Sequence, residues 1–423
     1  MTNISQKTDG VDILHDTEIN AILNKIQNGT DTDVRISGRY ATLGTFESGW
    51  GVKKPATYVI YRDTSTYYAE DGRTGDVSFS GTDAQVVIQA AVNAIQTAPG
   101  FTTKSGLLYF KAGNYSLSSA ILIDGSASTT IQNITITGDD KLISRFTPTV
   151  NLPAFRIKTI TQGTTFRNVC FAISAGLDTS YTHSMIECED NCEWVEVSNC
   201  YFNRGNAIRG QDGTGWLVSG NNFEATHTGI GMTAATGFSS ALVRIVGNHW
   251  SNQKSGSVAI NFTDNNSRQN LYVLIADNVF AGTAGATAIS ASMIRSIIHG
   301  NEINFWGTAI EEKGTADRNY IFGNHLHSNT VSVTKIGTNT QVRNNFGYAT
   351  ESGGDSSISH GTTVSHGLAT TPSRIVLISQ SASPRITSIK SKSASTFTVG
   401  LWNTAGSALT GSGATRAFWY AEV

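Results

Sequence analysis

The unit Gly220-Asn221-Asn222-Phe223 recurs along the middle of the chain and decides the fold. It returns as Gly247-Asn248-His249-Trp250, Asp277-Asn278-Val279-Phe280, Gly300-Asn301-Glu302-Ile303 and Gly323-Asn324-His325-Leu326. Related forms stand at Asn168-Val169-Cys170-Phe171, Asn199-Cys200-Tyr201-Phe202 and Asn344-Asn345-Phe346. A unit that recurs every 20 to 50 residues indicates a repeat protein whose coils or hairpins stack on one another.

The spacing of the units identifies the kind of repeat. Their large apolar residues lie 31, 21, 27, 30, 23, 23 and 20 positions apart. A helical repeat does not tolerate such variation, whereas a β-coil lets extra residues loop out between strands. A second apolar residue follows after six to ten positions, at Ile208, Ile230, Ile260, Ile289, Ile310 and Val333. We therefore predict an all-β fold, a right-handed parallel β-helix over residues 107–350.

Stacking of the coils also gives the recurring asparagine of the unit a role. Asparagine tolerates the left-handed backbone conformation at turns, and its amide can donate a hydrogen bond to the next amide in line. We predict a structural asparagine ladder made of Asn221, Asn248, Asn278, Asn301, Asn324 and Asn344.

The chain on both sides of the β-helix has a different pattern. Residues 1–50 contain one short amphipathic helix, with Ile19, Ile22, Leu23 and Ile26 on one face. About 11 residues are too few for a helix to be stable alone, so this face packs either on copies of itself or on its own chain. Residues 51–106 contain hairpin strands and a second helix, capped at Thr82-Asp83 and ended by Pro99-Gly100. Residues 356–423 show strand-like runs typical of a small β-sandwich.

Composition excludes several classes of protein. The formal net charge is −2 and no basic block occurs, so we expect no nucleic-acid partner. No run of 18 apolar residues is present, so we expect no membrane insertion and no signal peptide. Cys170, Cys188, Cys192 and Cys200 are interpreted as buried thiols rather than a zinc site or disulfides. We expect neither a resident metal nor a cofactor, and interpret the acids Glu187, Glu189, Asp190, Glu193 and Glu196 as a solvated face.

Three segments resemble a known family of proteins. The capped helix followed by residues 107–115, Leu-Leu-Tyr-Phe-Lys-Ala-Gly-Asn-Tyr, resembles the start of the pectate-lyase-like β-helix in viral tailspikes and in related bacterial and archaeal surface proteins. Residues 363–372 resemble a small module that closes many phage tail-fibre chains, and residues 12–22 look like a virion-attachment segment. The resemblance implies a homotrimer on a virion tail that binds a host-surface glycan, with other tail or baseplate proteins as partners of the N-terminus.

Candidate site residues come from the position just before each large apolar residue, which should face outward. Glu302 and His325 should be neighbours there and could serve as acid and base, although a surface ion pair needs no function. Glu224 is a second carboxylate on the same flank, but at about 14 Å from Glu302 it is too far for a glycosidase pair. For carbohydrate binding we predict Trp306, as an exposed ring, together with His249, Tyr201 and Asn222.

The sequence thus predicts a virion tail spike or fibre that binds host-surface carbohydrate as a receptor-binding protein, with enzymatic activity left open. One alternative is a secreted or cell-surface polysaccharide lyase or glycoside hydrolase. The other is a non-enzymatic structural adhesin, which would share the fold without any chemistry.

Overall fold

A computed structural model describes residues 33–36, 39–42, 56–97, 103–124, 130–158, 161–178, 180–189, 192–234, 240–264, 269–381, 383, 385–410 and 415–423. The chain divides into two compact units, Met1–Lys54 and Pro55–Val423. In the first unit, β1 (Asp33–Ile36) pairs antiparallel with β2 (Arg39–Thr42). The predicted helix around residues 19–26 lies outside the described residues.

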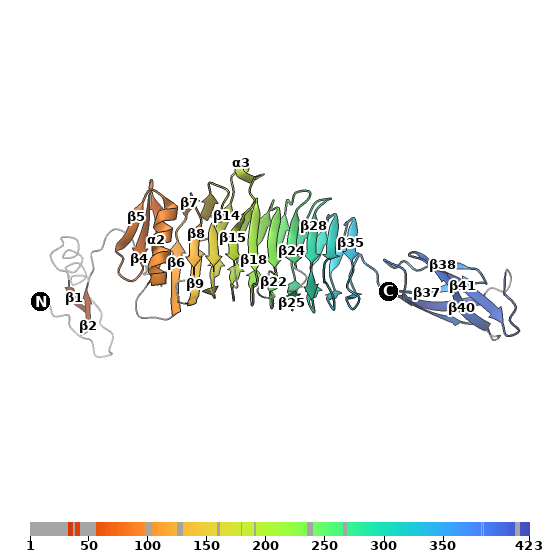
Figure 1. Ribbon diagram of the computed structural model, residues 1–423. Coiled ribbons are helices and arrows are strands. Elements are labelled where there is room, and N and C mark those ends of the chain that lie inside the picture. The colour runs from red at the N-terminus through yellow and green to blue at the C-terminus, as the bar shows by residue number, and fades with distance from the viewer. Residues whose placement is uncertain are drawn as a thin grey trace, which may run out of the picture. The chain divides into compact units, whose positions relative to one another are not determined.

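Most of the second unit is a parallel β-helix, as predicted, with three long sheets that we name I, II and III (Figure 1). Sheet I contains β36 (Gln341–Arg343), β33 (Tyr320–Phe322), β30 (Ile297–His299), β26 (Leu274–Ala276), β22 (Arg244–Val246), β19 (Leu217–Ser219), β16 (Glu196–Ser198), β13 (Thr165–Arg167), β9 (Thr130–Gly138), β6 (Thr103–Phe110), β3 (Tyr58–Asp63), β4 (Thr66–Asp71) and β5 (Val77–Gly81), in that order, and β12 (Thr161–Gln162) pairs with β9.

The other two long sheets have nine strands each. Sheet II contains β34 (His325–His327), β31 (Glu302–Asn304), β27 (Val279–Ala281), β23 (His249–Ser251), β20 (Asn222–Glu224), β17 (Tyr201–Asn203), β14 (Cys170–Ala172), β10 (Ser144–Pro148) and β7 (Gly113–Leu117). Sheet III contains β35 (Val331–Thr334), β32 (Thr308–Glu312), β28 (Thr287–Ala291), β24 (Val258–Thr263), β21 (Thr228–Thr233), β18 (Asn206–Gln211), β15 (Ser184–Glu189), β11 (Phe155–Lys158) and β8 (Ile121–Asp124). A further parallel pair joins β25 (Asn270–Leu271) to β29 (Met293–Ile294).

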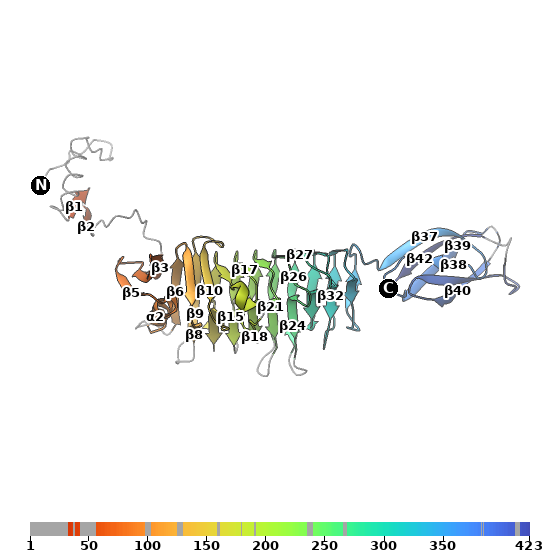
Figure 2. The ribbon, with the colours of Figure 1, turned by 90° about the horizontal axis from the view of Figure 1, so that it is seen from above.

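Nine successive coils each contribute one strand to each sheet, and sheet I has further strands at both ends. Figure 2 shows the coils following one another along the solenoid. The core lies between the sheets, where inward side chains of the same kind meet in register. Five aromatic rings form one continuous stack, with centroids 4.5 to 5.1 Å apart and planes within 9° of parallel: Phe171, Phe202, Phe223, Trp250 and Phe280. All five side chains are fully buried, and the four cysteine thiols, which are free, are buried as well.

The asparagines of the repeat form a buried chain of hydrogen bonds. The side-chain amide of Asn248 donates to Asn278 Oδ1 over 3.0 Å, and that of Asn278 donates to Asn301 Oδ1 over 2.9 Å. The same oxygens also accept the backbone N–H of the preceding asparagine. The last member is Asn345 rather than the predicted Asn344, because the left-handed turn position is the residue before each ladder asparagine, and Asn344 occupies it with φ of 51°.

The predicted register of the final unit was therefore wrong by one residue. The unit Asn344-Asn345-Phe346 lacks the residue that separates asparagine from the apolar side chain in earlier units. Phe346 consequently pairs with His325 in the outward position and is 64% exposed instead of buried.

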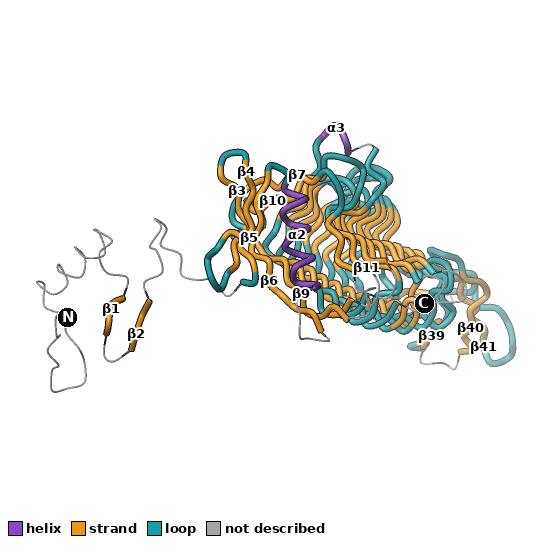
Figure 3. The backbone as a smooth tube through the Cα atoms, turned by 60° about the vertical axis from the view of Figure 1, so that its left-hand side comes forward, coloured by secondary structure: helices purple, strands orange, loops and turns teal. Residues whose placement is uncertain are grey.

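A helix closes the first coil. Figure 3 shows α2 (Ala84–Thr97) lying across the end of the stacked strands. Asp83 caps the helix by accepting the Gln85 N–H, and an apolar stripe that includes Val87, Ile88 and Ala91 is buried. The side-chain amide of Gln89 bonds both the N–H and the carbonyl of Leu122 on β8, the first strand of sheet III. The helix thereby satisfies part of an edge that could otherwise pair with another chain.

The C-terminal strands form two small antiparallel sheets. One contains β37 (Glu351–Ile358), β42 (Thr415–Glu422) and β39 (Arg374–Ser379), and the other contains β38 (Thr363–Ser365), β41 (Thr396–Asn403) and β40 (Arg385–Lys392). They enclose a separate core with Ile358, Phe397 and Leu401 at its centre, which is the predicted β-sandwich. The exact domain boundaries near residues 51, 107 and 356 stay a prediction. None of the helices in the described part of the chain is long and apolar enough to span a membrane.

We expect Asn278→Ala to destabilise the protein by roughly 2–4 kcal/mol, because the buried Asn248 N–H and amide lose their acceptor. Urea denaturation followed by circular dichroism measures the change. Asn261→Ala, at an outward position of β24, is the matched control and should leave the midpoint nearly unchanged. Equal effects of the two substitutions would contradict the ladder's contribution.

Candidate functional site

The outward side chains of sheet II form one polar surface, which we call the sheet II face. The strand register places Tyr201, Asn222, His249, Val279, Glu302 and His325 in one row. A parallel row contains Asn203, Glu224, Ser251, Asn304 and His327. Neighbouring strands lie about 4.8 Å apart, so the backbone positions of Glu224 and Glu302, which are three strands apart and in different rows, are at least about 14 Å apart. These two carboxylates are not within the roughly 5 to 10 Å range of a glycosidase pair.

Tyr201 and Glu224 form a hydrogen-bonded pair in the middle of this face. The Tyr201 hydroxyl donates to Glu224 Oε2, while the Asn252 amide donates to Glu224 Oε1 over 3.0 Å. The Tyr201 hydrogen bond, followed by that from Asn252, lowers the pKa of Glu224. Burial and then Glu224 raise the pKa of Tyr201 to about 12. At neutral pH the pair is therefore a fixed carboxylate acceptor beside a neutral phenol.

A lysine reaches the same face from one side. Lys141 lies in the loop of residues 139–143 between β9 and β10, and its Nζ is 3.4 Å from Oδ1 of Asn222, three coils further along. Leu142 and Ile143 of this loop are exposed. The loop therefore adds a cation and apolar surface beside the polar row.

A charge cluster centred on a buried aspartate lies at the other side of sheet II. Asp178 belongs to α3 (Ala175–Asp178), in the loop of residues 173–178 and 180–183 that we call the α3 loop, which stands out from the coils in Figure 1. Asp178 is 6% exposed, pairs with Lys254 Nζ, accepts the Gly205 N–H over 3.0 Å, and lies 3.5 Å from His227 Nε2. Burial alone would raise the pKa of Asp178, but the bonds from Lys254 and Gly205 outweigh it, so the pKa is lowered.

The partners of Asp178 come from three successive coils, so this cluster fastens the α3 loop over three turns between sheets II and III. Sequence reasoning did not find it. The one available signal was the interval from Phe171 to Phe202, which at 31 residues is the longest between units. That length predicts an insertion, but no motif in it identifies Lys254, which lies 76 residues away from Asp178.

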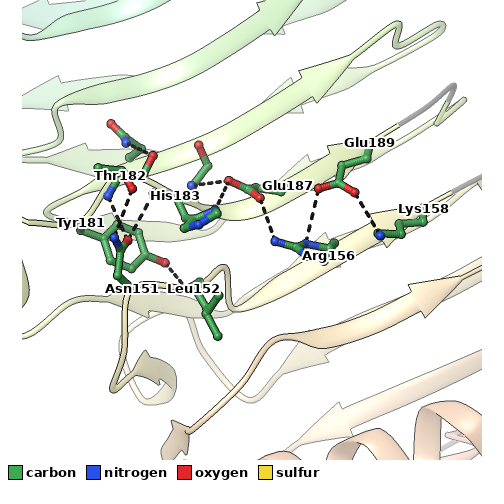
Figure 4. A network of polar contacts seen from close by, with 11 residues as sticks. Asn151, Leu152, Arg156, Lys158, Tyr181, Thr182, His183, Glu187 and Glu189 are labelled. Carbon is green, nitrogen blue, oxygen red and sulfur yellow. Dashed lines mark hydrogen bonds and ion pairs between the residues drawn. The ribbon is translucent and has the colours of Figure 1, made fainter.

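Sheet III carries a different network of charges (Figure 4). Arg156 lies between two acids, 3.8 Å from Glu187 and 3.5 Å from Glu189, and Lys158 Nζ is 3.4 Å from Glu189. Glu187 also contacts His183 Nδ1 at 3.1 Å and accepts the Ser184 N–H. The interpretation of these acids as a solvated face was wrong for Glu187, whose side chain is only 3% exposed. Basic residues of the preceding strand neutralise the acids.

The same view shows how this region is joined to the coil before it. Asn151 donates to the Thr182 hydroxyl over 3.1 Å and accepts the Thr182 N–H over 3.0 Å. The Tyr181 hydroxyl donates to the Leu152 carbonyl over 2.7 Å. The C-terminal part of the α3 loop is therefore held by the coil before it, and Asp178 by the coils after it.

Trp306 does not belong to the surface. It was predicted as an exposed ring, but it is 1% exposed, and its indole N–H donates to the Phe280 carbonyl over 3.1 Å. Gly282 makes room for it, because a Cβ there would lie 2.2 Å from the indole. The ring turns inward after β31 and packs edge-on against the end of the aromatic stack. The exposed ring beside it is Phe305, at 59%.

At the far end of the sheet II face, Glu302 and His325 are directly opposite each other on β31 and β34. His327 joins them, with its Nε2 3.9 Å from Glu302 Oε1. His325 packs on the Phe346 ring with centroids 4.4 Å apart, and His327 meets Phe305 edge-on at 6.1 Å. Sequence reasoning paired Glu302 with His325 and did not include His327 in the site.

These features define a parallel β-helix protein with one polar, imidazole-rich sheet face bordered by two loops. No family model matches the sequence, and no curated protein matches it. Solved structures that are similar include ORF18 of Geobacillus virus E2, with 12% identity, coverage of 79% of this chain and 72% of that one, and a TM-score of 0.39. The Dettilon tailspike protein gp208 shows 12% identity, coverage of 81% and 91%, and a TM-score of 0.32.

An enzyme is also among the similar structures. DFA-IIIase from Arthrobacter chlorophenolicus A6, in complex with GF2, shows 17% identity and a TM-score of 0.43. The match covers 57% of this chain and 66% of that one, so this chain spans slightly less than two thirds of the enzyme's length. At identities this low and TM-scores below 0.5, none of these similarities assigns a family or an activity to this chain.

We expect Tyr201→Phe to raise the pKa of Glu224 toward its ordinary value, because the Tyr201 hydrogen bond is the largest cause of the lowered pKa. A ¹³C titration of the protein labelled at glutamate carboxyl carbons measures it. Tyr320→Phe, at an exposed position of sheet I, is the control. An unchanged Glu224 titration in Tyr201→Phe would contradict the assignment.

We expect Asp178→Asn to loosen the α3 loop by roughly 1–3 kcal/mol, because a hydrogen-bonded ion pair with Lys254 is lost. Since the folded pKa of Asp178 is lowered, its contribution is complete above the ordinary aspartate pKa of about 3.9 and disappears as pH falls through the folded value. Hydrogen exchange of the loop amides measures both effects. Asp140→Asn, in the loop of residues 139–143, should leave exchange in the α3 loop unchanged.

Proposed function

We propose that this protein is a virion tail spike or fibre that binds host-surface carbohydrate along the sheet II face. The observation that carries the proposal is the polar row Tyr201, Asn222, His249, Glu302 and His325, interrupted only by Val279. Its residues occupy six successive strands, which at about 4.8 Å each give a surface roughly 24 Å long. A row of this length fits an extended chain of sugars better than a single small molecule.

The chemistry of the row supports a carbohydrate ligand. Amides, phenols and imidazoles exchange hydrogen bonds with hydroxyl groups, which sugars present on every ring. Glu224 is a fixed acceptor with both oxygens already oriented, and Lys141 supplies a cation next to Asn222. This combination would accept a polysaccharide that carries both hydroxyl groups and acidic groups.

The proposal includes the assembly expected of such a spike: a homotrimer located on the virion tail, with its N-terminal segment bound to other tail or baseplate proteins. The residues that would make this attachment lie largely outside the described part of the chain. A location outside the cell or on its surface is the alternative that belongs to the enzyme and adhesin hypotheses.

Degradation of the bound carbohydrate is a second candidate function, and Glu224 is the residue that favours it. Glu224 is ionised at neutral pH and lies on the outward face of sheet II, so it would be the proton acceptor toward a bound sugar, and its lowered pKa would make it a weak one. Glu302 and His325 remain candidates for the same chemistry at the far end of the face. The separation of about 14 Å between the two carboxylates argues against direct cooperation between them.

We expect the purified protein to bind surface polysaccharide from its host, and Asn222→Ala/His249→Ala to weaken binding by about 5- to 30-fold through the loss of one or two hydrogen bonds. Biolayer interferometry on immobilised polysaccharide measures the affinity. The matched control is Asn261→Ala, which lies in the same coil as His249 but on sheet III.

The same samples decide between binding and degradation. Shortened chains on size exclusion, with new reducing ends or unsaturated products, would identify a depolymerase, and Glu224→Gln, Glu302→Gln and His325→Ala would then locate the chemistry. Binding with unchanged chain length would identify a receptor-binding protein without that activity. Equal loss of binding in the sheet III control, or no binding to any glycan of a broad panel, would contradict the proposal that the sheet II face binds carbohydrate.

A further inference from the structure

We propose that Glu302, His325 and His327 form a binding site for a divalent transition metal ion, with Zn²⁺ as the best fit. One nitrogen from each imidazole and one carboxylate oxygen all lie within 4.8 Å of one another. Among the described residues, no other group of three such side chains comes together in this way. The expectation of no metal, drawn from the sequence, is revised by this geometry.

The strand register explains why the three ligands converge. Glu302 opens β31, and His325 opens the next strand, β34, directly opposite. His327 lies two residues after His325, so both imidazoles leave the same face of one strand. The backbone of the β-helix therefore fixes the spacing of the ligands, and only side-chain rotation remains to close the site.

Small movements of the three side chains would bring their ligand atoms to the distances that a bound zinc ion requires. Ligand atoms about 2.1 Å from a tetrahedral zinc lie about 3.4 Å from one another. His327 Nε2 and Glu302 Oε1 are already 3.9 Å apart. The half-exposed Glu302 side chain can approach further without disturbing the core, since it rests on the surface of sheet II.

The surroundings of the three ligands also favour a cation. No lysine or arginine forms an ion pair with Glu302 in the described part of the chain, where its partners are His327 and the Asn304 amide at 3.4 Å. Two exposed rings, Phe305 and Phe346, pack on His327 and His325 and restrict how the imidazoles turn. The site thus has a carboxylate without a lysine or arginine partner in the described residues and two imidazoles that are oriented by neighbouring rings.

The ligand types select the class of metal. Imidazole and carboxylate together suit zinc, copper, nickel and cobalt, whereas calcium and magnesium take oxygen ligands. Two histidines and one glutamate leave at least one coordination position open for water or for an oxygen of a bound molecule. This inference is independent of the proposed carbohydrate binding, because it concerns the ion alone.

The test is a titration of the full-length, tag-free protein with Co²⁺ followed by visible absorption, and with Zn²⁺ followed by calorimetry and by displacement of Co²⁺. We expect saturable binding of one ion per chain. His325→Ala, His327→Ala and Glu302→Gln should each weaken binding by more than about tenfold, since even a hydrogen-bond partner of a metal ligand is worth about 10- to 100-fold.

The matched control is His299→Ala. His299 lies in the same coil as Glu302 and also stacks on an exposed phenylalanine, Phe322, with centroids 5.3 Å apart, but it does not belong to the three-ligand group. The His299→Ala variant should bind Zn²⁺ with the same affinity as the unmodified protein. Circular dichroism and thermal melting of every variant establish that the β-helix is intact.

Two results would overturn the inference: absence of saturable Zn²⁺ and Co²⁺ binding, or equal affinity in the His325→Ala/His327→Ala double variant and the unmodified protein. Neither result depends on any glycan. A metal site without carbohydrate binding, or carbohydrate binding without a metal site, would therefore separate this inference from the proposed function.

Discussion

Hydrogen bonds between successive coils hold this molecule together, because a single coil has no partner within itself for its strand N–H and carbonyl groups. In all three long sheets of the β-helix, each strand after the first coil pairs in parallel with the equivalent strand of the coil before it. Equivalent residues are then stacked, and whatever side chain stands at one position meets its counterpart about 4.8 Å away. The aromatic stack and the asparagine ladder are both direct results of this constraint.

The same constraint separates the residues that stabilise the β-helix from the residues that are available for binding. Inward positions must match their neighbours in size and polarity, so most of them are apolar, and asparagine, serine and threonine are common among the buried polar residues. Outward positions are constrained only by solubility and by neighbours on the same face. Sheet III uses this freedom for alternating charges such as Arg156 and Glu187, while sheet II presents amides, phenol and imidazoles. Insertions between strands, such as the α3 loop, then add charged groups at the borders of a face.

The repeat unit allowed much of this to be predicted from the sequence, since a fixed asparagine and a large apolar residue determine which neighbours face in and out. Prediction failed where the unit changed: Asn344-Asn345-Phe346 lacks one residue, and this exposes Phe346. It also failed for Trp306, because a turn residue can point either way, and only Gly282 on the adjacent coil makes the inward position available. The Asp178 cluster could not be predicted, because its partners lie in three other coils and share no spacing.

The aromatic stack also bears on how such a chain could change over evolutionary time. Phe202, Phe223 and Trp250 each stack on the ring before and the ring after, so duplication of one whole coil would insert a further ring and a further asparagine between existing ones. The genetic event would lengthen the sheet II face by one strand without creating a new edge or an unfilled core. A recognition surface of this type would then grow, shrink or be exchanged by whole coils rather than by single residues.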